Sequence, residues 1–145
     1  MTKNYDPKMH SAEHLLNQTM VRLLGCSRCF SAHINKKKSK CDYHFDRDLT
    51  GLEIKQLQDM VNQQIEKNHP VTIENLSKEK AQEAFNIERV PDQEDLNEVR
   101  IVSIGDYDAC PCIGPHVNST REIGMFKITT TGFKDGVLRI RFKLM

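Results

Sequence analysis

Two pairs of metal-ligating side chains stand near opposite ends of this chain. His10 and His14 are four residues apart, and on a helix that spacing places both imidazoles on one face, a turn from each other. Cys112 and His116 are also four apart, within ACPCIGPHVNSTREIG, residues 109–124, whose prolines and glycines indicate a loop. Either pair alone is more simply explained by partly exposed histidines or by a structured turn with a buried thiol. Together they predict a single zinc site, because Zn²⁺ accepts nitrogen and sulfur ligands.

A second set of sulfur ligands gives an alternative metal site. Cys26 and Cys29 form a Cys-x-x-Cys pair, and with Cys110 and Cys112 they could hold a structural zinc. That site would make the protein a binding module and would leave the histidine pair without a role. A lone Cys-x-x-Cys is a weak signal, so the shared histidine–cysteine site is the preferred hypothesis.

The order of residues in HSAEH argues against a zinc protease. In the protease motif H-E-x-x-H, the glutamate directly follows the first histidine and serves as the general base. Here Ser11 follows His10, and Glu13 directly precedes His14, so a base at that position is expected to be misaimed. We therefore do not expect proteolysis.

The elements that must position these residues can be read from caps and apolar spacing. Asp6 and Pro7 indicate the start of a helix and Gly25 its end, with apolar side chains at helical spacing between them. The other expected elements are two strands within 30–47 around the tip NKKKSK, a helix from the capping box Thr50–Glu53 to about Lys67, strands at 71–76 and 99–108, a helix at 77–85, and a hairpin over 124–145 with Asp135-Gly136 near its turn. This irregular order favours an α+β fold, a mostly antiparallel sheet packed with helices, with the zinc site between the first helix and the late loop.

Composition sets the broad class. With 145 residues, 38% of them hydrophobic and 28% charged, the chain is expected to form a single domain over residues 1–145. We expect no membrane-spanning segment and no signal peptide, hence a cytoplasmic protein whose five cysteines are thiols or metal ligands. The formal net charge of +1 does not by itself indicate a polyanionic partner.

Several motifs resemble one protein family over nearly the whole chain. HSAEHLL, YHFD, LTGLEIKQLQDMVNQQIEKNHPV, IGDYD, CIGPHV and STREIG occur in the order found in the zinc-binding editing domain shared by alanyl- and threonyl-tRNA synthetases. Freestanding alanyl-tRNA editing proteins of the AlaX type, short form, have the same domain. IGDYD and Pro111-Cys112 are similar to the alanyl branch, whereas Gly114-Pro115-His116-Val117 is similar to the threonyl branch.

The resemblance implies an enzyme and its metal ligands. It implies that His10, His14, Cys112 and His116 bind zinc, and that the domain hydrolyses a wrongly attached amino acid, typically serine, from the acceptor end of tRNA. The resulting hypothesis is a zinc-dependent deacylase that acts in trans on Ser-tRNA(Ala). Ser-tRNA(Thr) is the alternative substrate, and a non-catalytic, zinc-stabilised tRNA-binding module is the alternative function.

Further residues are candidates for contacting the substrate. Those expected near its amino group or hydroxyl are Ser31, His33, Asn35, Asp106 and Asp108, although each alone is better explained by capping turns and satisfying backbone groups. Those expected to meet tRNA phosphates are Lys36, Lys37, Lys38 and Lys40 at the hairpin tip, and Arg139, Arg141 and Lys143 on one face of the last strand. We expect neither DNA nor a membrane as a partner, and the sequence leaves the oligomeric state and the role of Cys110 open.

Overall fold

A computed structural model describes residues 5–85 and 98–145. The helices are α1 (Pro7–Leu24), α2 (Gly51–Glu66), α3 (Lys78–Ala84) and the 3-10 helix η2 (Thr120–Ile123). The strands are β1 (Ser31–His33), β2 (Ser39–His44), β3 (Val71–Ser77), β4 (Glu98–Ile104), β5 (Asp108–Pro111), β6 (Phe126–Lys134) and β7 (Val137–Leu144). All strand pairs are antiparallel. The predicted fold class is therefore confirmed: a single α+β domain.

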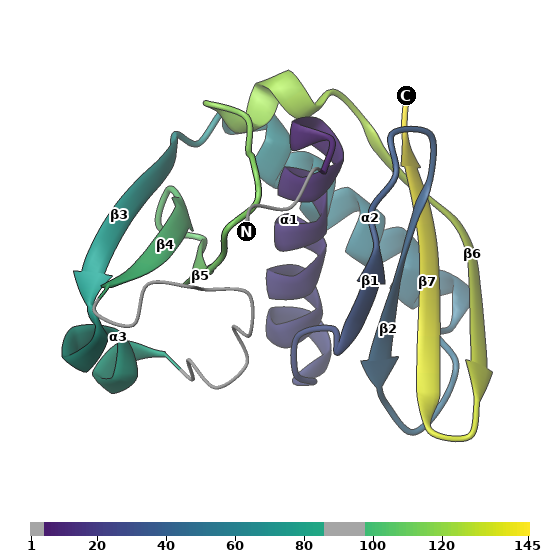
Figure 1. The fold of residues 1–145 in the computed structure, drawn as a ribbon. Coiled ribbons are helices and arrows are strands. Elements are labelled where there is room, and N and C mark those ends of the chain that lie inside the picture. Colours follow the sequence, from purple (N-terminus) through teal and green to yellow (C-terminus); the bar gives the residue numbers. More distant parts are fainter. Residues whose placement is uncertain (1–4, 86–97) are drawn as a thin grey trace.

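Helix α1 runs through the middle of the molecule between two sheets (Figure 1). Its N-cap Asp6 accepts a hydrogen bond from the Met9 amide, and Gly25 at its end has a left-handed φ of 70°, as the sequence predicted. Every residue from 9 to 17 is buried, the polar ones included. A helix covered on all sides can bury polar side chains only where they find partners. The buried polar side chains of α1 and the residues that they contact form the candidate site described below.

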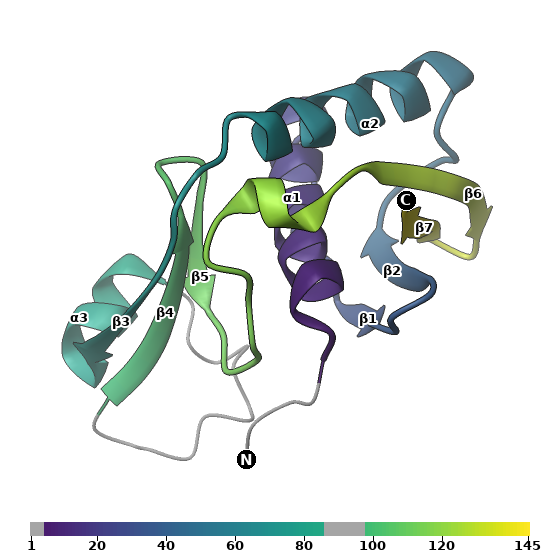
Figure 2. The ribbon, with the colours of Figure 1, turned by 90° about the horizontal axis from the view of Figure 1, so that it is seen from above.

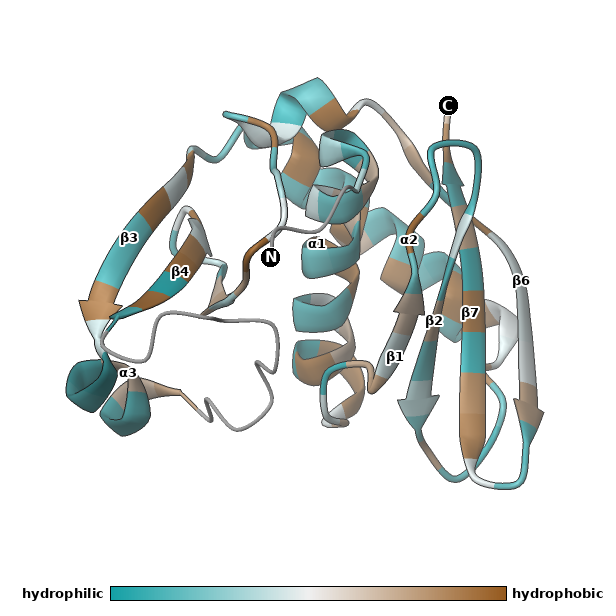
Figure 3. Ribbon diagram, in the orientation of Figure 1, coloured by the Kyte–Doolittle hydropathy of each residue, from teal (hydrophilic) through white to brown (hydrophobic). Residues whose placement is uncertain are grey.

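The larger sheet has the order β1-β2-β7-β6 and forms one wall of the main core. In β7, Leu138, Ile140 and Phe142 are buried and alternate with Arg139 and Arg141, a pattern visible as alternating colours in Figure 3. Helix α2 lies across this sheet and α1 when the molecule is viewed from above (Figure 2). The apolar face of the larger sheet therefore packs against α1 and α2, and the main core lies between these three elements.

The smaller sheet, β3-β4-β5, lies on the other side of α1 (Figures 1 and 2). Helix α3 packs against it through a small separate cluster of Ala81, Val99 and Ile101. The edge strand β5 leads directly into the segment with Cys112 and His116. This sheet thus carries the late part of the chain to the side of α1 that the larger sheet leaves open.

The sequence predicted the helices and the hairpins well, but two boundaries were wrong. The expected strand 99–108 ends at Ile104, because Gly105 turns the chain with a φ of 51°. The segment 109–124 was expected to be a loop, yet its first residues belong to β5 and Thr120–Ile123 form η2. Pro111 is tolerated in β5 because an edge strand can lack an amide donor. No described helix has the length and apolar character needed to cross a membrane.

Candidate metal centre

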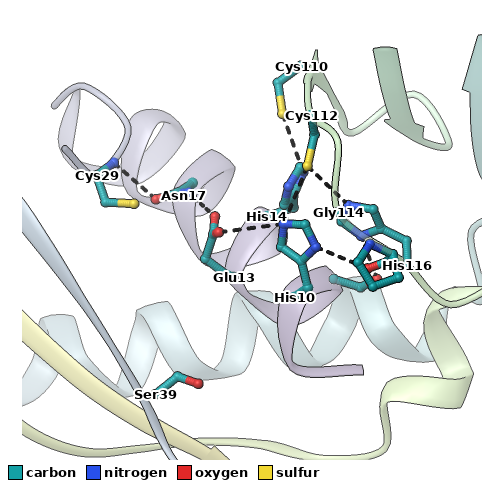
Figure 4. A network of polar contacts seen from close by, with 12 residues as sticks. His10, Glu13, His14, Asn17, Cys29, Ser39, Cys110, Cys112, Gly114 and His116 are labelled. Carbon is teal, nitrogen blue, oxygen red and sulfur yellow. Dashed lines mark hydrogen bonds and ion pairs between the residues drawn. The ribbon is translucent and has the colours of Figure 1, made fainter. Parts of the chain in front are cut away.

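The two predicted ligand pairs meet in the structure. His10, His14, Cys112 and His116 each offer one ligand atom, and these four atoms all lie within 4.8 Å of one another. The first two come from the N-terminal half of α1 and the others from the segment after β5 (Figure 4). The predicted metal site between the first helix and the late loop is confirmed as a His/Cys cluster compatible with a metal ion.

Two of the imidazoles are held in a defined orientation. His10 Nδ1 donates a hydrogen bond of 3.0 Å to the Pro115 carbonyl oxygen, which leaves Nε2 facing Cys112 Sγ at 3.4 Å. His116 Nδ1 lies 2.9 Å from Ser11 Oγ, and its Nε2 faces the same sulfur at 3.6 Å. Metal-binding histidines characteristically donate their other ring N–H to such a partner, which fixes the tautomer. Both rings therefore direct Nε2 toward one point.

The third imidazole is oriented by a buried carboxylate. His14 Nδ1 lies 3.6 Å from Asp108 Oδ2 and 3.3 Å from Cys110 Sγ, which leaves Nε2 for an ion. The side chain of Asp108 is completely buried, and Arg28 binds it through two hydrogen bonds of 2.7 and 3.3 Å. Gln18 donates a further bond of 2.9 Å. A second group, of His14, Asp108 and Cys110, is also within ligand distance, but Arg28 already neutralises its carboxylate.

Two of the four ligands, Cys112 and His116, are already in the protonation state that a metal requires. Burial opposes ionisation of Cys112, but hydrogen bonds from His10, His116 and His14 lower its pKa to about 2. Burial lowers the pKa of His116 to about 4, and the nearby imidazoles also lower it, against the opposing effect of the thiolate. At neutral pH the sulfur is therefore a thiolate and His116 is neutral, which are the ligating forms.

The segment that carries the late pair is tied to β4. Arg100 Nη1 donates to the carbonyl oxygens of Cys112 and Gly114 at 2.8 and 3.0 Å, and the Cys112 amide donates to the Arg100 carbonyl. Gly114 lies so close to His10 that an added Cβ would be 2.3 Å from its ring. A glycine is therefore required where this segment passes the His10 ring, and the hydrogen bonds between Arg100 and the segment hold the backbone in that position.

The donor set of three imidazole nitrogens and one thiolate is a combination that zinc accepts. The four-cysteine alternative is wrong, since Cys26 and Cys29 belong to neither group of potential ligands. The thiol of Cys26 instead points to the Met20 carbonyl at 3.7 Å, and the Cys29 amide donates to Asn17. Local Cys-x-x-Cys spacing could not reveal that these two residues hydrogen-bond to Met20 and Asn17 of α1.

Most residues expected to contact the substrate do not reach the cluster. Asp108 does, but as the partner of His14 and Arg28. Asp106 is exposed in the turn between β4 and β5. Ser31, His33 and Asn35 are exposed on or beyond β1, where the intervening Ala32 packs toward the core. Their substrate contacts stay predictions.

The residues expected to meet tRNA gather on the outer face of the larger sheet and at its tip. Lys36, Lys37 and Lys38 are exposed between β1 and β2. Lys40 pairs with Arg141 across β2 and β7, and Lys143 follows on the same face. Arg139 differs, because Asp42 accepts hydrogen bonds of 2.8 and 2.9 Å from it.

One side chain at the cluster was not among the predicted site residues. Glu13 was considered only as the base of a zinc protease, yet its Oε1 lies 4.0 Å from His10 Nε2, the nitrogen that faces the other ligands (Figure 4). Residues three apart on a helix are neighbours, so the i, i+3 spacing from His10 was the available signal. Ser11 and Arg28 were also missed, because their partners are remote in sequence.

Comparisons with known proteins agree with this geometry. Residues 99–141 match the threonyl and alanyl tRNA synthetase second additional domain. The alanine–tRNA ligases of Francisella philomiragia subsp. philomiragia and Francisella tularensis subsp. mediasiatica are each 35% identical to the chain over 133 residues. That alignment covers 90% of this chain. Residues 99–141 thus belong to this second additional domain, and most of the chain is homologous to one region of alanine–tRNA ligases.

This homology confirms the resemblance predicted from the motifs. The matched region of the second additional domain includes β4, β5 and the segment with Cys112 and His116, while the longer alignment covers most of the chain. The chain spans only 15% of the length of the alanine–tRNA ligases that it matches. The homology therefore concerns one region of those ligases and not their whole activity.

Proposed function

We propose that this chain is a zinc-dependent hydrolase that removes a wrongly attached amino acid from tRNA, acting in trans on Ser-tRNA(Ala). One observation carries the proposal: the convergence of His10, His14, Cys112 and His116 in a chain homologous to part of alanine–tRNA ligases. The motifs and the homology together support one editing domain over residues 1–145. An ester-hydrolysing metal centre is the chemistry that these residues fit best.

The bond to be broken is the ester between the amino acid and the terminal ribose of tRNA. The four ligands would hold zinc, which when bound polarises a carbonyl and lowers the pKa of water toward about 7. Hydrolysis consumes one water and releases the free amino acid and the ribose hydroxyl. Ser11, Pro115 and Asp108 contribute by fixing each imidazole with Nε2 toward the ion.

Access to the centre requires some freedom in the ligand set. Four protein ligands complete a tetrahedron, whereas catalytic zinc usually keeps one position open. We propose that one member of the late pair, Cys112 or His116, is the loosely held ligand. His10 and His14 are fixed by a helix that is buried throughout this stretch, so they are the less mobile pair.

The outer face of the larger sheet is our proposed tRNA surface. Lys36, Lys37, Lys38 and the Lys40–Arg141 pair, with Lys143, offer cations for phosphate contacts. Arg139 contributes less, since its guanidinium is already paired with Asp42. We keep Ser31, His33, Asn35 and Asp106 as candidates for contacting the acceptor end.

Ser-tRNA(Thr) is the second candidate substrate. The observation that favours it is the segment Gly114-Pro115-His116-Val117, which is similar to the threonyl branch, and which the structure places directly at the cluster. A third possibility is a zinc-stabilised module that binds tRNA without hydrolysis. The three differ in what they release from charged tRNA.

A deacylation panel tests the proposal. Purified protein is incubated with Ser-tRNA(Ala), Gly-tRNA(Ala) and Ser-tRNA(Thr), with and without a chelator, and release of the amino acid is followed. We expect chelator-sensitive release from Ser-tRNA(Ala), and none from the zinc-free variant His10→Ala. Preferential release from Ser-tRNA(Thr) would select the second substrate. No release from any tRNA, with zinc bound, would end the enzyme hypothesis and leave the binding module.

A further inference from the structure

Glu13 is an acidic side chain placed against the metal centre without belonging to it. It lies on α1 one residue before His14, and the residue is only 8% exposed. Its Oε1 lies 4.0 Å from His10 Nε2, too far for a hydrogen bond. Burying a carboxylate is costly unless it is paired. With little of its surface in water, Glu13 is suited to pair with a cation that binds beside the cluster.

Of the two carboxylates that the described residues place beside the cluster, only Glu13 has an oxygen available. Both oxygens of Asp108 accept hydrogen bonds from Arg28, and Gln18 donates to one of them. In Glu13, Oε2 accepts a hydrogen bond from Asn17, whereas Oε1 accepts none from the described residues. No fully buried side-chain oxygen in the described part of the chain lacks a hydrogen bond, so Oε1 must be open to solvent.

A hydrogen bond from Asn17 fixes the orientation of the Glu13 side chain. The Asn17 side-chain nitrogen donates to Glu13, while the Asn17 side-chain oxygen accepts from the Tyr43 hydroxyl at 2.8 Å and the Cys29 amide at 3.1 Å. These two donors determine which end of the Asn17 amide faces Glu13. The open oxygen is therefore held in place beside His10 rather than left to sample other rotamers.

We propose that Glu13 binds the α-ammonium group of the aminoacyl ester and so selects substrates with a free amino group. The inference rests on the proposed function, because it concerns the same site. In an aminoacyl ester the amino nitrogen is about 2.5 Å from the carbonyl carbon. An ammonium held by Oε1 at about 2.8 Å would thus place the ester carbonyl beside the metal centre. Glu13 acts here as a specificity-determining residue, and no step requires it to gain or lose a proton.

The test compares two non-hydrolysable analogues of the substrate end. One is 3′-deoxy-3′-(L-serylamino)adenosine, and the other is the same compound with the amino group replaced by hydrogen. Binding of each to zinc-loaded protein is measured by calorimetry for the wild type, for Glu13→Gln and for the control Glu66→Gln, an exposed carboxylate on α2. Zinc content and the visible spectrum of the cobalt-substituted protein are recorded for each variant.

We expect the wild type and Glu66→Gln to prefer the amine at least about tenfold, about 1.4 kcal/mol, and Glu13→Gln to lose that preference with its zinc content and cobalt spectrum unchanged. A wild type without the preference, or a Glu13→Gln variant that keeps it, would overturn the inference. Loss of zinc from Glu13→Gln would also overturn it, since Glu13 would then support the cluster itself. Because binding is measured without turnover, these results are independent of the deacylation panel that decides the proposed function.

Discussion

The closest constraint on the metal centre is the contact between Gly114 and His10, and it yields a sharp prediction. In Gly114→Ala the added Cβ would lie 2.3 Å from His10 Cε1 and 2.6 Å from Nδ1, whereas ordinary contact begins at 3.4 Å. The ring and the backbone must therefore separate by about 1.1 Å, the difference between 3.4 and 2.3 Å. Metal–ligand distances tolerate only about 0.2 Å. The substitution should thus remove one ligand from the set.

The expected size of the effect follows from related perturbations. Disturbing a group that only orients a ligand costs about 10–100-fold in metal affinity, so displacing the ligand itself should cost at least about 100-fold, or about 2.7 kcal/mol. The hydrogen bond from His10 Nδ1 to the Pro115 carbonyl is lost in the same movement. The assay is competition for zinc against a chromophoric chelator, with thermal unfolding recorded for the metal-free protein.

Gly132→Ala is the matched control, because nothing lies within 4 Å of the added Cβ on β6. It should bind zinc as the wild type does. If Gly114→Ala bound zinc within about threefold of the wild type while folding normally, the ligand role of His10 would be refuted.

Four other predictions follow from the structure. Arg28→Met leaves the buried Asp108 carboxylate without its main partner and should lower the unfolding free energy of the metal-free protein by about 2–3 kcal/mol at neutral pH. Adding Asp108→Asn to the Arg28→Met variant removes the unpaired charge and should restore part of this loss. Burial opposes ionisation of Asp108, yet His14 and Arg28 hold its pKa below the ordinary 3.8. The ion pair of Asp108 should therefore stabilise the wild type above pH 3.8, and this stabilisation should be lost as the pH falls through the pKa of Asp108 in the folded protein. A pH series of denaturant melts in which Arg28→Met and the wild type stay parallel would contradict this. Burial opposes the charged form of His14, but Cys110 and Asp108 raise its pKa well above 6.5, so zinc must displace a proton from this imidazole. Zinc binding should therefore release about one proton from His14 and should weaken as the pH falls. Calorimetry in buffers of different ionisation enthalpy measures this proton, and zinc binding without its release would contradict the prediction. Arg141→Gln should weaken tRNA binding and reduce by about 1 the slope of log affinity against log salt concentration. Arg139→Gln should change both less, because Arg139 is already paired with Asp42. Equal effects of the two variants in filter binding at several salt concentrations would count against the outer sheet face as the tRNA surface.

The parts of the fold that local chemistry determines were predictable. Asp6, Pro7 and Gly25 mark the ends of α1, and Thr50 with Glu53 opens α2, because capping depends on residues within one turn. The boundary at Gly105 was missed since a single glycine after an apolar run does not by itself reveal a turn. The packing of His69 beneath it becomes visible only in three dimensions.

The site was predictable only as far as its residue types and helical spacing reach. His10 and His14 reveal their common face through i, i+4 spacing, and the late pair was matched to them by ligand chemistry. The roles of Asp108 and Glu13 were not predictable. Asp108 depends on Arg28, eighty residues earlier, and Glu13 depends on the rotamer that Asn17 imposes.

X-ray absorption at the zinc edge of the loaded protein tests the central claim most directly. The account predicts one zinc per chain with one sulfur at about 2.3 Å and three nitrogens at about 2.0–2.1 Å. Failure to bind one zinc per chain, or a coordination sphere with two or more sulfurs, would contradict it.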